Sequence, residues 1–290
     1  MPAQEPARPP EFPARADGRP TISVVIPTLN EAKTIGRCLE ALQHGDLAEE
    51  IIVVDNGSDD DTVAIALRFP RVRVIAEPRR GISFARLTGF DAARGDVIAR
   101  IDADSVVRSD WVDRLRCLFA ADGVDAVGGV DAVGGGAAIG ELSPGRMFWF
   151  GWWYRWFRGW HQRSIGVRPM LYGFNSAFRR RAWERARHLV ETDDQEVSED
   201  VDVTIALLRT GHRLQHAPTL MVKARLFRSI DREKLARYYR TDSLTLTRHG
   251  YGNPRRWVGA PATGEVASSL VTPPAPVSSA DPDRVRRGTA

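Results

Sequence analysis

The sequence predicts an α/β fold in which helices flank a mostly parallel sheet. Short runs of β-branched residues alternate with helical patterns along the first half of the chain, as in folds built from strand–helix–strand units. The apolar runs are continuous, which is typical of strands buried on both faces. Polar residues follow several of these runs, at the edge where open α/β sheets bind ligands. The length of 290 residues and the 27% of charged residues suit a globular protein with a substantial core.

Each element follows from its own pattern. The expected strands are residues 22–26, 51–54, 72–76, 97–101 and 125–130. The expected helices between them are residues 31–44, 60–69, 83–93 and 110–121. Helical patterns also cover residues 199–211 and 231–248. Asn30 and Asp59 are the expected N-caps of the first two helices, and Gly45 and Gly95 stand where C-terminal caps are expected.

The two ends differ from the rest of the chain. Residues 1–20 are rich in Pro, Ala and Arg, and they lack the apolar core of a signal peptide. Residues 259–290 are rich in Pro, Ser, Ala and Arg without periodicity. Both ends are predicted to be disordered tails, which leaves residues 21–258 as the folded domain. No run of about 18 uncharged apolar residues is present, so no membrane-spanning helix is expected.

The charge of the chain is mildly basic. The net charge is +4, and the positive charge comes almost entirely from arginine. This balance is compatible with an anionic ligand, a membrane surface or nucleic acid, and does not choose among them. The two cysteines, Cys38 and Cys117, show neither metal nor disulfide spacing, so a reducing cytoplasm is the expected location.

Acidic side chains collect where the predicted strands end. Asp102 and Asp104 follow the strand at residues 97–101 and are two residues apart, so on an extended chain both face the same side. Thr28, Glu31 and Asp55 follow two other strands. Each residue alone is explained by turn or cap chemistry. Together they indicate a hard divalent cation, or a ligand with many donors such as a nucleoside.

Two common nucleotide motifs are excluded. A dinucleotide-binding strand would be followed by a glycine-rich turn, but Pro27 stands in that place. A glycine run at residues 134–136 lacks the Lys-Ser/Thr and the helix that a phosphate loop requires, so it is interpreted as a flexible loop.

The motifs resemble those of glycosyltransferase family 2. The residues that carry the resemblance are 23–31, 51–62, 81–86, 95–104, 173–179 and 199–202. The resemblance implies a GT-A fold, a Rossmann-like, mostly parallel sheet flanked by helices with an acceptor-side helical subregion. Residues 21–130 would be the nucleotide-sugar-binding half and residues 131–258 the acceptor-binding half. The implied reaction is inverting transfer of one sugar from a nucleoside diphosphate donor, with Mn²⁺ or Mg²⁺.

Roles for single residues follow from the same resemblance. The nucleotide-sugar site would be formed by Pro27, Thr28, Glu31, Asp55, Arg86 and Asp102. Asp104 would ligate the metal. Asp200 would be the general base for the acceptor hydroxyl, with Glu199 supporting it. Without the resemblance, this acidic pair reads as a partner of the helix dipole or a cap.

A tryptophan-rich segment lies between the acidic motifs. One helical face would carry Trp149, Trp152, Trp153, Trp156 and Trp160. This face either packs against the sheet and shapes the acceptor cleft, or lies at a lipid headgroup boundary beside the neighbouring arginines. The resemblance puts Trp153, Trp156 and Asn175 on the acceptor side. The expected partners are a glycan or lipid-linked acceptor and a peripheral contact with the inner face of the cell membrane, without nucleic acid.

Two alternative functions are open. A sugar nucleotidyltransferase also uses an α/β sheet and carboxylate-bound Mg²⁺, but it requires a glycine-rich basic loop where residues 27–31 stand. A non-catalytic scaffold that retains the fold predicts no metal-dependent donor binding. Residues 237–241 weakly resemble the signature of processive members, but Thr241 stands where Trp is expected, which favours transfer of a single sugar.

Overall fold

The computed structural model describes residues 11–120, 126–131, 156, 170–190, 197–223 and 232–250. The strands are β1 Ile22–Thr28, β2 Glu50–Asp55, β3 Val72–Ala76, β4 Val97–Ile101, β5 Val106–Val107, β6 Ala126–Asp131, β7 Asn175–Arg179 and β8 Leu214–Lys223. The helices are α1 Ile35–Ala41, α2 Thr62–Ala66, α3 Ile82–Ala92, α4 Trp111–Ala120, α6 Arg180–Ala186, α7 Glu199–Arg209 and α8 Arg232–Arg248, with a 3₁₀ turn, η2, at Arg187–Leu189. Residues 1–10 and the predicted tail 259–290 lie outside the described residues.

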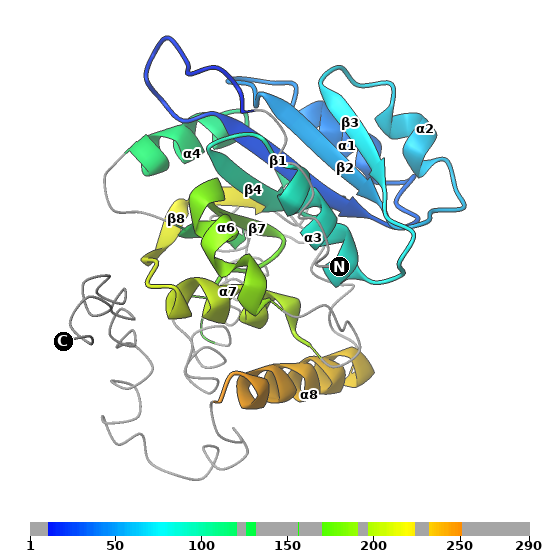
Figure 1. Ribbon diagram of the computed structural model, residues 1–290. Coiled ribbons are helices and arrows are strands. Elements are labelled where there is room, and N and C mark those ends of the chain that lie inside the picture. The colour runs from blue at the N-terminus through cyan, green and yellow to red at the C-terminus, as the bar shows by residue number, and fades with distance from the viewer. Residues whose placement is uncertain are drawn as a thin grey trace, which may run out of the picture.

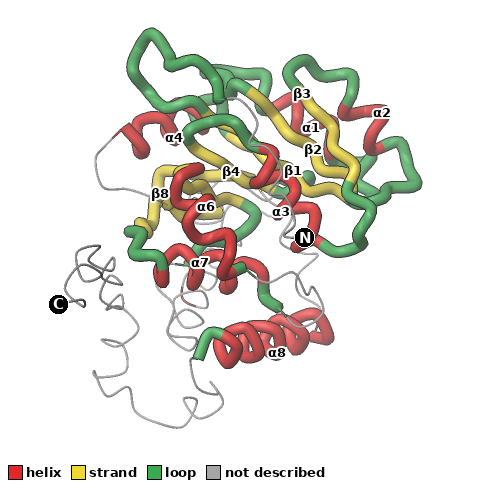
Figure 2. The backbone as a smooth tube through the Cα atoms, in the orientation of Figure 1, coloured by secondary structure: helices red, strands yellow, loops and turns green. Residues whose placement is uncertain are grey.

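The described strands form one sheet in the order β3-β2-β1-β4-β7-β6-β8-β5. The parallel pairs are β1 with β2, β1 with β4, β2 with β3, and β6 with β8. The antiparallel pairs are β4 with β7, β6 with β7, and β5 with β8. Helices lie on both faces of this sheet (Figures 1 and 2). The expected α/β class with a mostly parallel sheet is confirmed.

Three strands were not expected from the sequence, namely β5, β7 and β8. Strand β7 has no apolar periodicity because it begins with Asn175 and Ser176, both of which are buried. Strand β8 contains a proline, a residue that usually argues against a strand. Both strands depend on partners far away in the sequence, so local pattern is a weak signal for them.

The first two helices begin later than expected. Asn30 adopts a left-handed backbone with φ of 57°, and its side-chain oxygen accepts a hydrogen bond from the Asp59 backbone N–H. Helix α1 therefore starts at Ile35 and helix α2 at Thr62. The prediction that Asn30 and Asp59 are N-caps is wrong, because these residues tie two loops together.

The two glycines expected at helix ends have different roles. Gly45 has a left-handed φ of 78°, as a C-terminal cap would, but α1 already ends at Ala41. A β-carbon at Gly95 would lie 2.7 Å from the Ser23 backbone nitrogen. Gly95 is therefore required by close approach to β1, and the prediction of a helix cap there is wrong.

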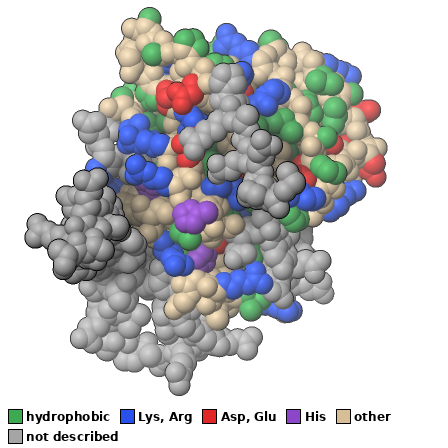
Figure 3. Space-filling model, viewed as in Figure 1, with side chains coloured by type: hydrophobic (Ala, Val, Ile, Leu, Met, Phe, Trp, Pro, Cys, Tyr) green, Lys and Arg blue, Asp and Glu red, His purple; other side chains and the backbone are tan. Residues whose placement is uncertain are grey.

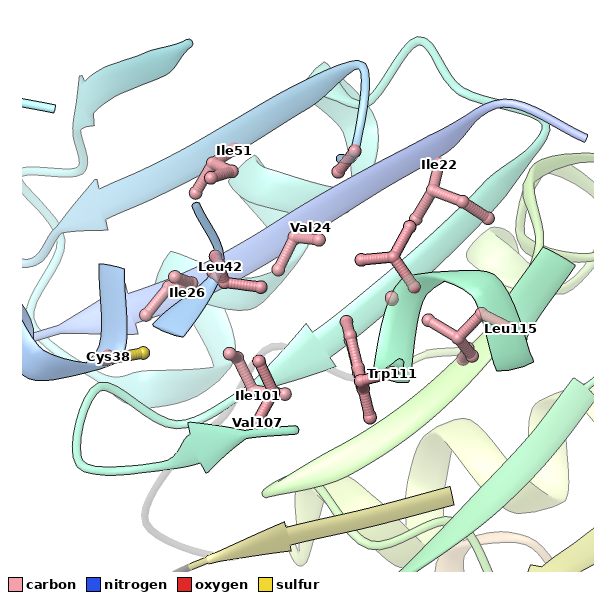
Figure 4. Packing of buried hydrophobic residues seen from close by; sticks show 14 of the residues in the cluster. Ile22, Val24, Ile26, Cys38, Leu42, Ile51, Ile101, Val107, Trp111 and Leu115 are labelled. Carbon is pink, nitrogen blue, oxygen red and sulfur yellow. The ribbon is translucent and has the colours of Figure 1, made fainter. Parts of the chain in front are cut away.

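The core consists of two apolar layers, one on each face of the sheet. Val24 and Ile26 of β1 face the layer that contains α1 and α4 (Figure 4), whereas Val25 faces the layer of α3, α6 and α7. A β-carbon at Gly89 of α3 would lie 2.4 Å from Val25 Cγ1, so α3 lies unusually close to the sheet. This close packing fixes the position of α3, which carries Arg86.

Residues 11–20 pack against the body of the protein, although they fall within the range expected to be disordered. Arg15 pairs with Glu49 at 2.9 Å, and Arg19 pairs with Asp113 at 2.7 Å. The fully buried Arg116 of α4 holds the same region by pairing with Asp46 at 2.7 Å. An ion-pair network therefore links this segment to α4.

Helix α8 confirms the helical pattern expected at residues 231–248. It lies beside α7 at the edge of the molecule (Figure 1). Its Leu246 packs with Val201 and Ile205 of α7, and His249 contacts Asp202 at 2.6 Å.

Candidate functional site

The carboxyl ends of β1, β2 and β4 meet at one edge of the sheet. Thr28 of β1 is in register with Asp55 of β2, and β1 also pairs in parallel with β4. The residues expected to line the site from these strands lie at or just beyond this edge: Pro27, Thr28, Glu31, Asp55, Asp102 and Asp104. The topology therefore brings together the acids that the sequence places after separate strands.

Asp55 lies in a turn that is held from two sides. Its carboxylate accepts a hydrogen bond from the Ser58 backbone N–H at 3.1 Å. The neighbouring Asn56 donates from its amide to the carbonyl oxygens of Glu77 and Arg79, at 3.0 and 2.7 Å, and accepts from the Gly81 N–H. Asn56 thereby fixes the loop between β3 and α3. The sequence analysis did not single out Asn56, although an Asn-Gly pair marks the turn.

Two buried arginines converge on Asp200 from different elements. Arg86 of α3 and Arg100 of β4 place their Nη1 atoms 3.0 and 2.9 Å from Asp200 Oδ1. Their side chains are only 4% and 3% exposed. The other oxygen of Asp200, Oδ2, accepts the Gly173 backbone N–H at 2.9 Å. We call this group of Arg86, Arg100, Asp200 and Gly173 the arginine clamp.

Arg100 is a residue of the candidate site that was not predicted from the sequence. Its signal was visible as an arginine inside the otherwise apolar strand at residues 97–101. A lone buried arginine requires carboxylate partners, and its partners are Asp102, at 3.2 Å, and Asp200.

Glu199 lies beside the arginine clamp without being tightly bound to it. Its carboxylate is 3.5 Å from Arg86 and 4.0 Å from Arg100. Burial raises the pKa of Glu199, and the negative charges of Asp200 and Asp102 raise it further, against the opposing effect of the two arginines. The site thus contains a carboxylate that holds a proton more tightly than an ordinary glutamate does.

Negative charge exceeds positive charge at this edge. Desolvation raises the pKa of Asp102, and Asp200 and Glu31 raise it further, although Arg100 and Arg86 oppose them. The two arginines face more carboxylates than they can neutralise, since Glu31, Asp102, Glu199 and Asp200 all act on the same region. Such a site favours a ligand or an ion that brings positive charge.

The residues present supply part of the ligand shell that a hard divalent cation needs. Asp102 and Asp104 supply carboxylate oxygens, and both side chains are partly accessible. Burial raises the pKa of the nearby Cys38 thiol, with Asp104 and Asp102 adding to the effect. Within the described residues, no group of three or more His, Cys, Asp or Glu side chains forms a ready-made metal cage. A cation would therefore complete its shell with ligand oxygens and water, as Mg²⁺ commonly does.

Of the residues expected on the acceptor side, the structure describes Asn175 and Trp156. Asn175 is fully buried, where its Oδ1 accepts from Trp111 Nε1 at 3.1 Å and its Nδ2 donates to the Leu220 carbonyl at 2.9 Å. It joins β7 to α4 and β8 and does not face an open surface. Trp156 is 56% exposed. Trp153 and the other tryptophans of the segment lie outside the described residues.

The described residues form no concentrated basic patch on the face seen in Figure 3. Lys and Arg side chains are spread over that face among other residues. In the part of the chain that the structure describes, no helix combines the length and the apolar character needed to cross a membrane.

Comparison with known families decides the class of the protein. The model of the family described as "Glycosyl transferase family 2" matches residues 23–186, which is more than half of the chain. The chain belongs to glycosyl transferase family 2. The resemblance inferred from the motifs is confirmed, and the protein is classed among the glycosyltransferases. The matched range includes the carboxyl edge, Arg86 and Arg100.

Curated relatives match this family 2 protein over part of their length. Glycosyltransferase AglE of Haloferax volcanii is 36% identical over 117 residues, which is 38% of this chain and 38% of that protein. Succinoglycan biosynthesis protein ExoO of Rhizobium meliloti is 42% identical over 107 residues, or 36% of this chain and 31% of that protein. The similarity to these relatives therefore spans about a third of their length.

Solved structures show the same fold. A mannosyltransferase from Pyrobaculum calidifontis, in complex with GDP-Man and Mn²⁺, superposes with a TM-score of 0.61 at 20% identity. The superposition covers 91% of this chain and 72% of the mannosyltransferase chain. Glucosyl-3-phosphoglycerate synthase from Mycobacterium tuberculosis, in complex with Mn²⁺, UDP and glucosyl-3-phosphoglycerate, superposes with a TM-score of 0.57 at 22% identity. The superposition covers 81% of each chain. The GT-A fold of this family 2 protein is thereby confirmed.

Proposed function

We propose that this family 2 protein transfers a single sugar, with inversion, from a nucleoside diphosphate sugar to an acceptor hydroxyl. The observation that carries the proposal is the convergence of Glu199, Asp200 and the two buried arginines with Asp102 at the carboxyl edge of the sheet. Donor-side and acceptor-side chemistry would then meet within one cluster. The presence of nucleotide sugars or nucleotides in the related structures supports this use of the edge.

The donor would lie along the ends of β1, β2 and β4. Pro27, Thr28 and Glu31 would line the nucleoside pocket, and Asp55 would accept a hydrogen bond from the base. The fixed turn at Asp55 supports this role, because a carboxylate already held by the Ser58 N–H keeps its position when the ligand arrives. Asp102 would contact the ribose or the donor sugar.

Asp104 would hold a divalent metal, Mn²⁺ or Mg²⁺, as the ions in the related structures suggest. When bound, such an ion supplies positive charge to the departing diphosphate. Arg86 would assist from α3, because its guanidinium group is fixed at the clamp and carries a permanent charge. The excess of carboxylates at this edge supports the proposal that a cation binds there.

The reaction needs a carboxylate near the acceptor. The acceptor hydroxyl would lose its proton to the acidic pair at the start of α7 while its oxygen forms the bond to the anomeric carbon. The bond between that carbon and the diphosphate would break on the opposite face, with the electron pair leaving on the diphosphate. One displacement of this kind inverts the anomeric centre.

We also propose that the acceptor is a lipid-linked or cell-envelope glycan and that the protein acts in the cytoplasm at the inner face of the membrane. The support is the similarity to an undecaprenyl-phosphate 4-deoxy-4-formamido-L-arabinose transferase of Pseudomonas savastanoi, which is 34% identical over 117 residues. The exposed Trp156 is compatible with such a contact.

Calorimetric titration with UDP-, GDP- and dTDP-sugars, each with and without Mn²⁺, tests the proposed function. We expect one donor class to bind in a metal-dependent manner and to release nucleoside diphosphate when an acceptor is added. Release of pyrophosphate from a nucleoside triphosphate and a sugar phosphate would instead identify a nucleotidyltransferase. Failure of every donor to bind would favour the scaffold.

A further inference from the structure

We infer that Glu199 takes the proton from the acceptor hydroxyl and that Asp200 is a positioning residue which holds the arginine clamp. This inference rests on the proposed glycosyl transfer and reverses the roles that the sequence suggested for the two acids. It follows from the different surroundings of two neighbouring carboxylates on the first turn of α7.

Both oxygens of Asp200 are already engaged. Oδ1 receives Arg86 Nη1 and Arg100 Nη1, and Oδ2 receives the Gly173 N–H, all within 3.0 Å. Charge-assisted bonds of this kind are the strong ones. Oδ1 accepts two guanidinium N–H groups and Oδ2 accepts one backbone N–H, so three of the about four acceptor sites of the carboxylate are occupied. Asp200 is therefore poorly placed to accept a proton during turnover.

The backbone around Asp200 is held equally firmly. Its carbonyl oxygen accepts the Thr204 hydroxyl at 2.6 Å, and the Leu171 N–H donates to the same hydroxyl at 3.1 Å. Asp200 thus links α7 to α3, to β4 and to the segment before β7. Loss of its charge would leave two buried guanidinium groups without their main partner, which is costly in a protein interior.

Glu199 has the opposite properties. Its contacts to Arg86 and Arg100 are longer, at 3.5 and 4.0 Å, although a quarter of each of the two acidic side chains is accessible. The charged groups that face it among the described residues are Arg86 from α3, Arg100 from β4, Asp102 after β4, and Asp200 beside it. Burial raises its pKa, and the neighbouring acids raise it further. A carboxylate with a raised pKa is the better general base near neutral pH.

The proton balance of the step is complete. The acceptor O–H bond breaks as the proton moves to a Glu199 oxygen, and the acceptor oxygen bonds to the anomeric carbon. The leaving nucleoside diphosphate takes the electron pair of the broken glycosidic bond. Glu199 then returns its proton to water, while Asp200 and the two arginines remain as they were.

Three variants of the full chain test the assignment: Glu199→Gln, Asp200→Asn and Asp200→Glu. For each, we would measure donor affinity by calorimetry, thermal stability, and kcat as a function of pH. Glu199→Gln is expected to lower kcat by about 100-fold or more and to abolish the acidic limb of the pH profile of kcat. We expect donor affinity to change less than about 3-fold and the Tm to stay the same. Added formate should restore part of its activity, since formate can replace the missing carboxylate.

Asp200→Asn is expected to lower the Tm and to weaken donor binding, while its residual activity keeps the acidic limb and does not respond to formate. Asp200→Glu keeps the charge and should recover part of both the Tm and the donor affinity. This variant replaces Asp200→Asn in the test if Asp200→Asn does not fold. The assignment is overturned if Asp200→Asn binds donor normally and loses the acidic limb, or if Glu199→Gln turns over as the wild type does. Absence of transfer by the wild type with every donor would overturn the proposed function itself and, with it, this assignment.

Discussion

Gly173 lies directly against the guanidinium group of Arg100. A β-carbon at residue 173 would come within 1.7 Å of Arg100 Nη1. At the same time the Gly173 N–H donates to Asp200, so its backbone belongs to the arginine clamp. The glycine in this motif is thus explained by close approach to a buried charge, and not by a left-handed backbone.

Gly173→Ala should therefore break the clamp. The added methyl group has to push a buried guanidinium group from its carboxylate, which we expect to lower the free energy of unfolding by about 1–3 kcal/mol. Urea denaturation would measure the change. Gly36→Ala is the matched control, because a β-carbon there would make an ordinary contact of 3.5 Å with Ile65. A Gly173→Ala protein as stable as the wild type would contradict the geometry of the clamp.

Asp104→Asn should remove the metal dependence of donor binding. An amide oxygen is a weaker ligand for a hard cation than a carboxylate, and the variant also removes one negative charge from the site. We expect donor affinity in Mn²⁺ to fall by about tenfold or more, as for changes in metal sites. The control is Asp59→Asn, an exposed acid that follows β2. Equal affinity of wild type and Asp104→Asn in Mn²⁺ would exclude Asp104 as the ligand.

Glu77 should make the protein sensitive to acid. Its buried carboxylate accepts hydrogen bonds from Arg79 and Thr88. The pKa of Glu77 is thereby lowered from 4.5 to about 2, and the hydrogen bonds from the Arg79 side chain are the largest cause. Because the pKa is lowered by folding, the stabilisation is fully present above about pH 4.5 and is lost as the pH falls towards 2.

Glu77→Gln should accordingly lower the free energy of unfolding by about 1–3 kcal/mol at pH 7, with a difference that shrinks towards pH 2. Denaturation curves of the two proteins between pH 7 and pH 2 would measure it. Glu40→Gln, on the exposed face of α1, is the control and should be neutral. A difference that stays constant over this range would rule out the charged interaction as its origin.

Arg116 should be the centre of the contact between residues 11–20 and the body. It is fully buried and donates to the carbonyl oxygen of Pro20, within this segment, and to Asp46, Glu49 and the carbonyl oxygen of Leu47 in the body. Arg116→Met removes the buried charge that Asp46 and Glu49 share with Arg19 and Arg15, and we expect a loss of about 3–5 kcal/mol in unfolding free energy. Arg114 lies on the same helix as Arg116 and makes a partly exposed ion pair with Asp110, just before that helix. Arg114→Met should lower the free energy of unfolding by less than about 1 kcal/mol.

Limited proteolysis provides a second readout for the same pair of variants. Cleavage within residues 11–20 should accelerate in Arg116→Met and remain unchanged in Arg114→Met. Equal cleavage rates in the two variants would show that Arg116 does not secure this segment.

Local patterns predict the strands β1 to β4 because each is a largely apolar run. Residues 97–101 illustrate this, since a buried strand followed at once by Asp102 and Asp104 needs no distant partner to be recognised. The first residues of the helices are harder to predict from local patterns. The side chain of Asn30 contacts a residue 29 positions away, and that contact, rather than capping, decides its backbone conformation.

The sequence by itself determined the α/β class, the family, and the acids that follow the strands, because these depend on residue types within short windows. Tertiary structure alone decided the division of roles around Asp200. Arg86 and Arg100 lie 114 and 100 residues away from it in the chain, and a hydrogen bond over such a separation leaves no periodicity to read. Folding places two permanent charges on one carboxylate, with Arg86 and Arg100 at 3.0 and 2.9 Å from Asp200. Among the described residues, the same two arginines lie farther from the neighbouring Glu199, at 3.5 and 4.0 Å.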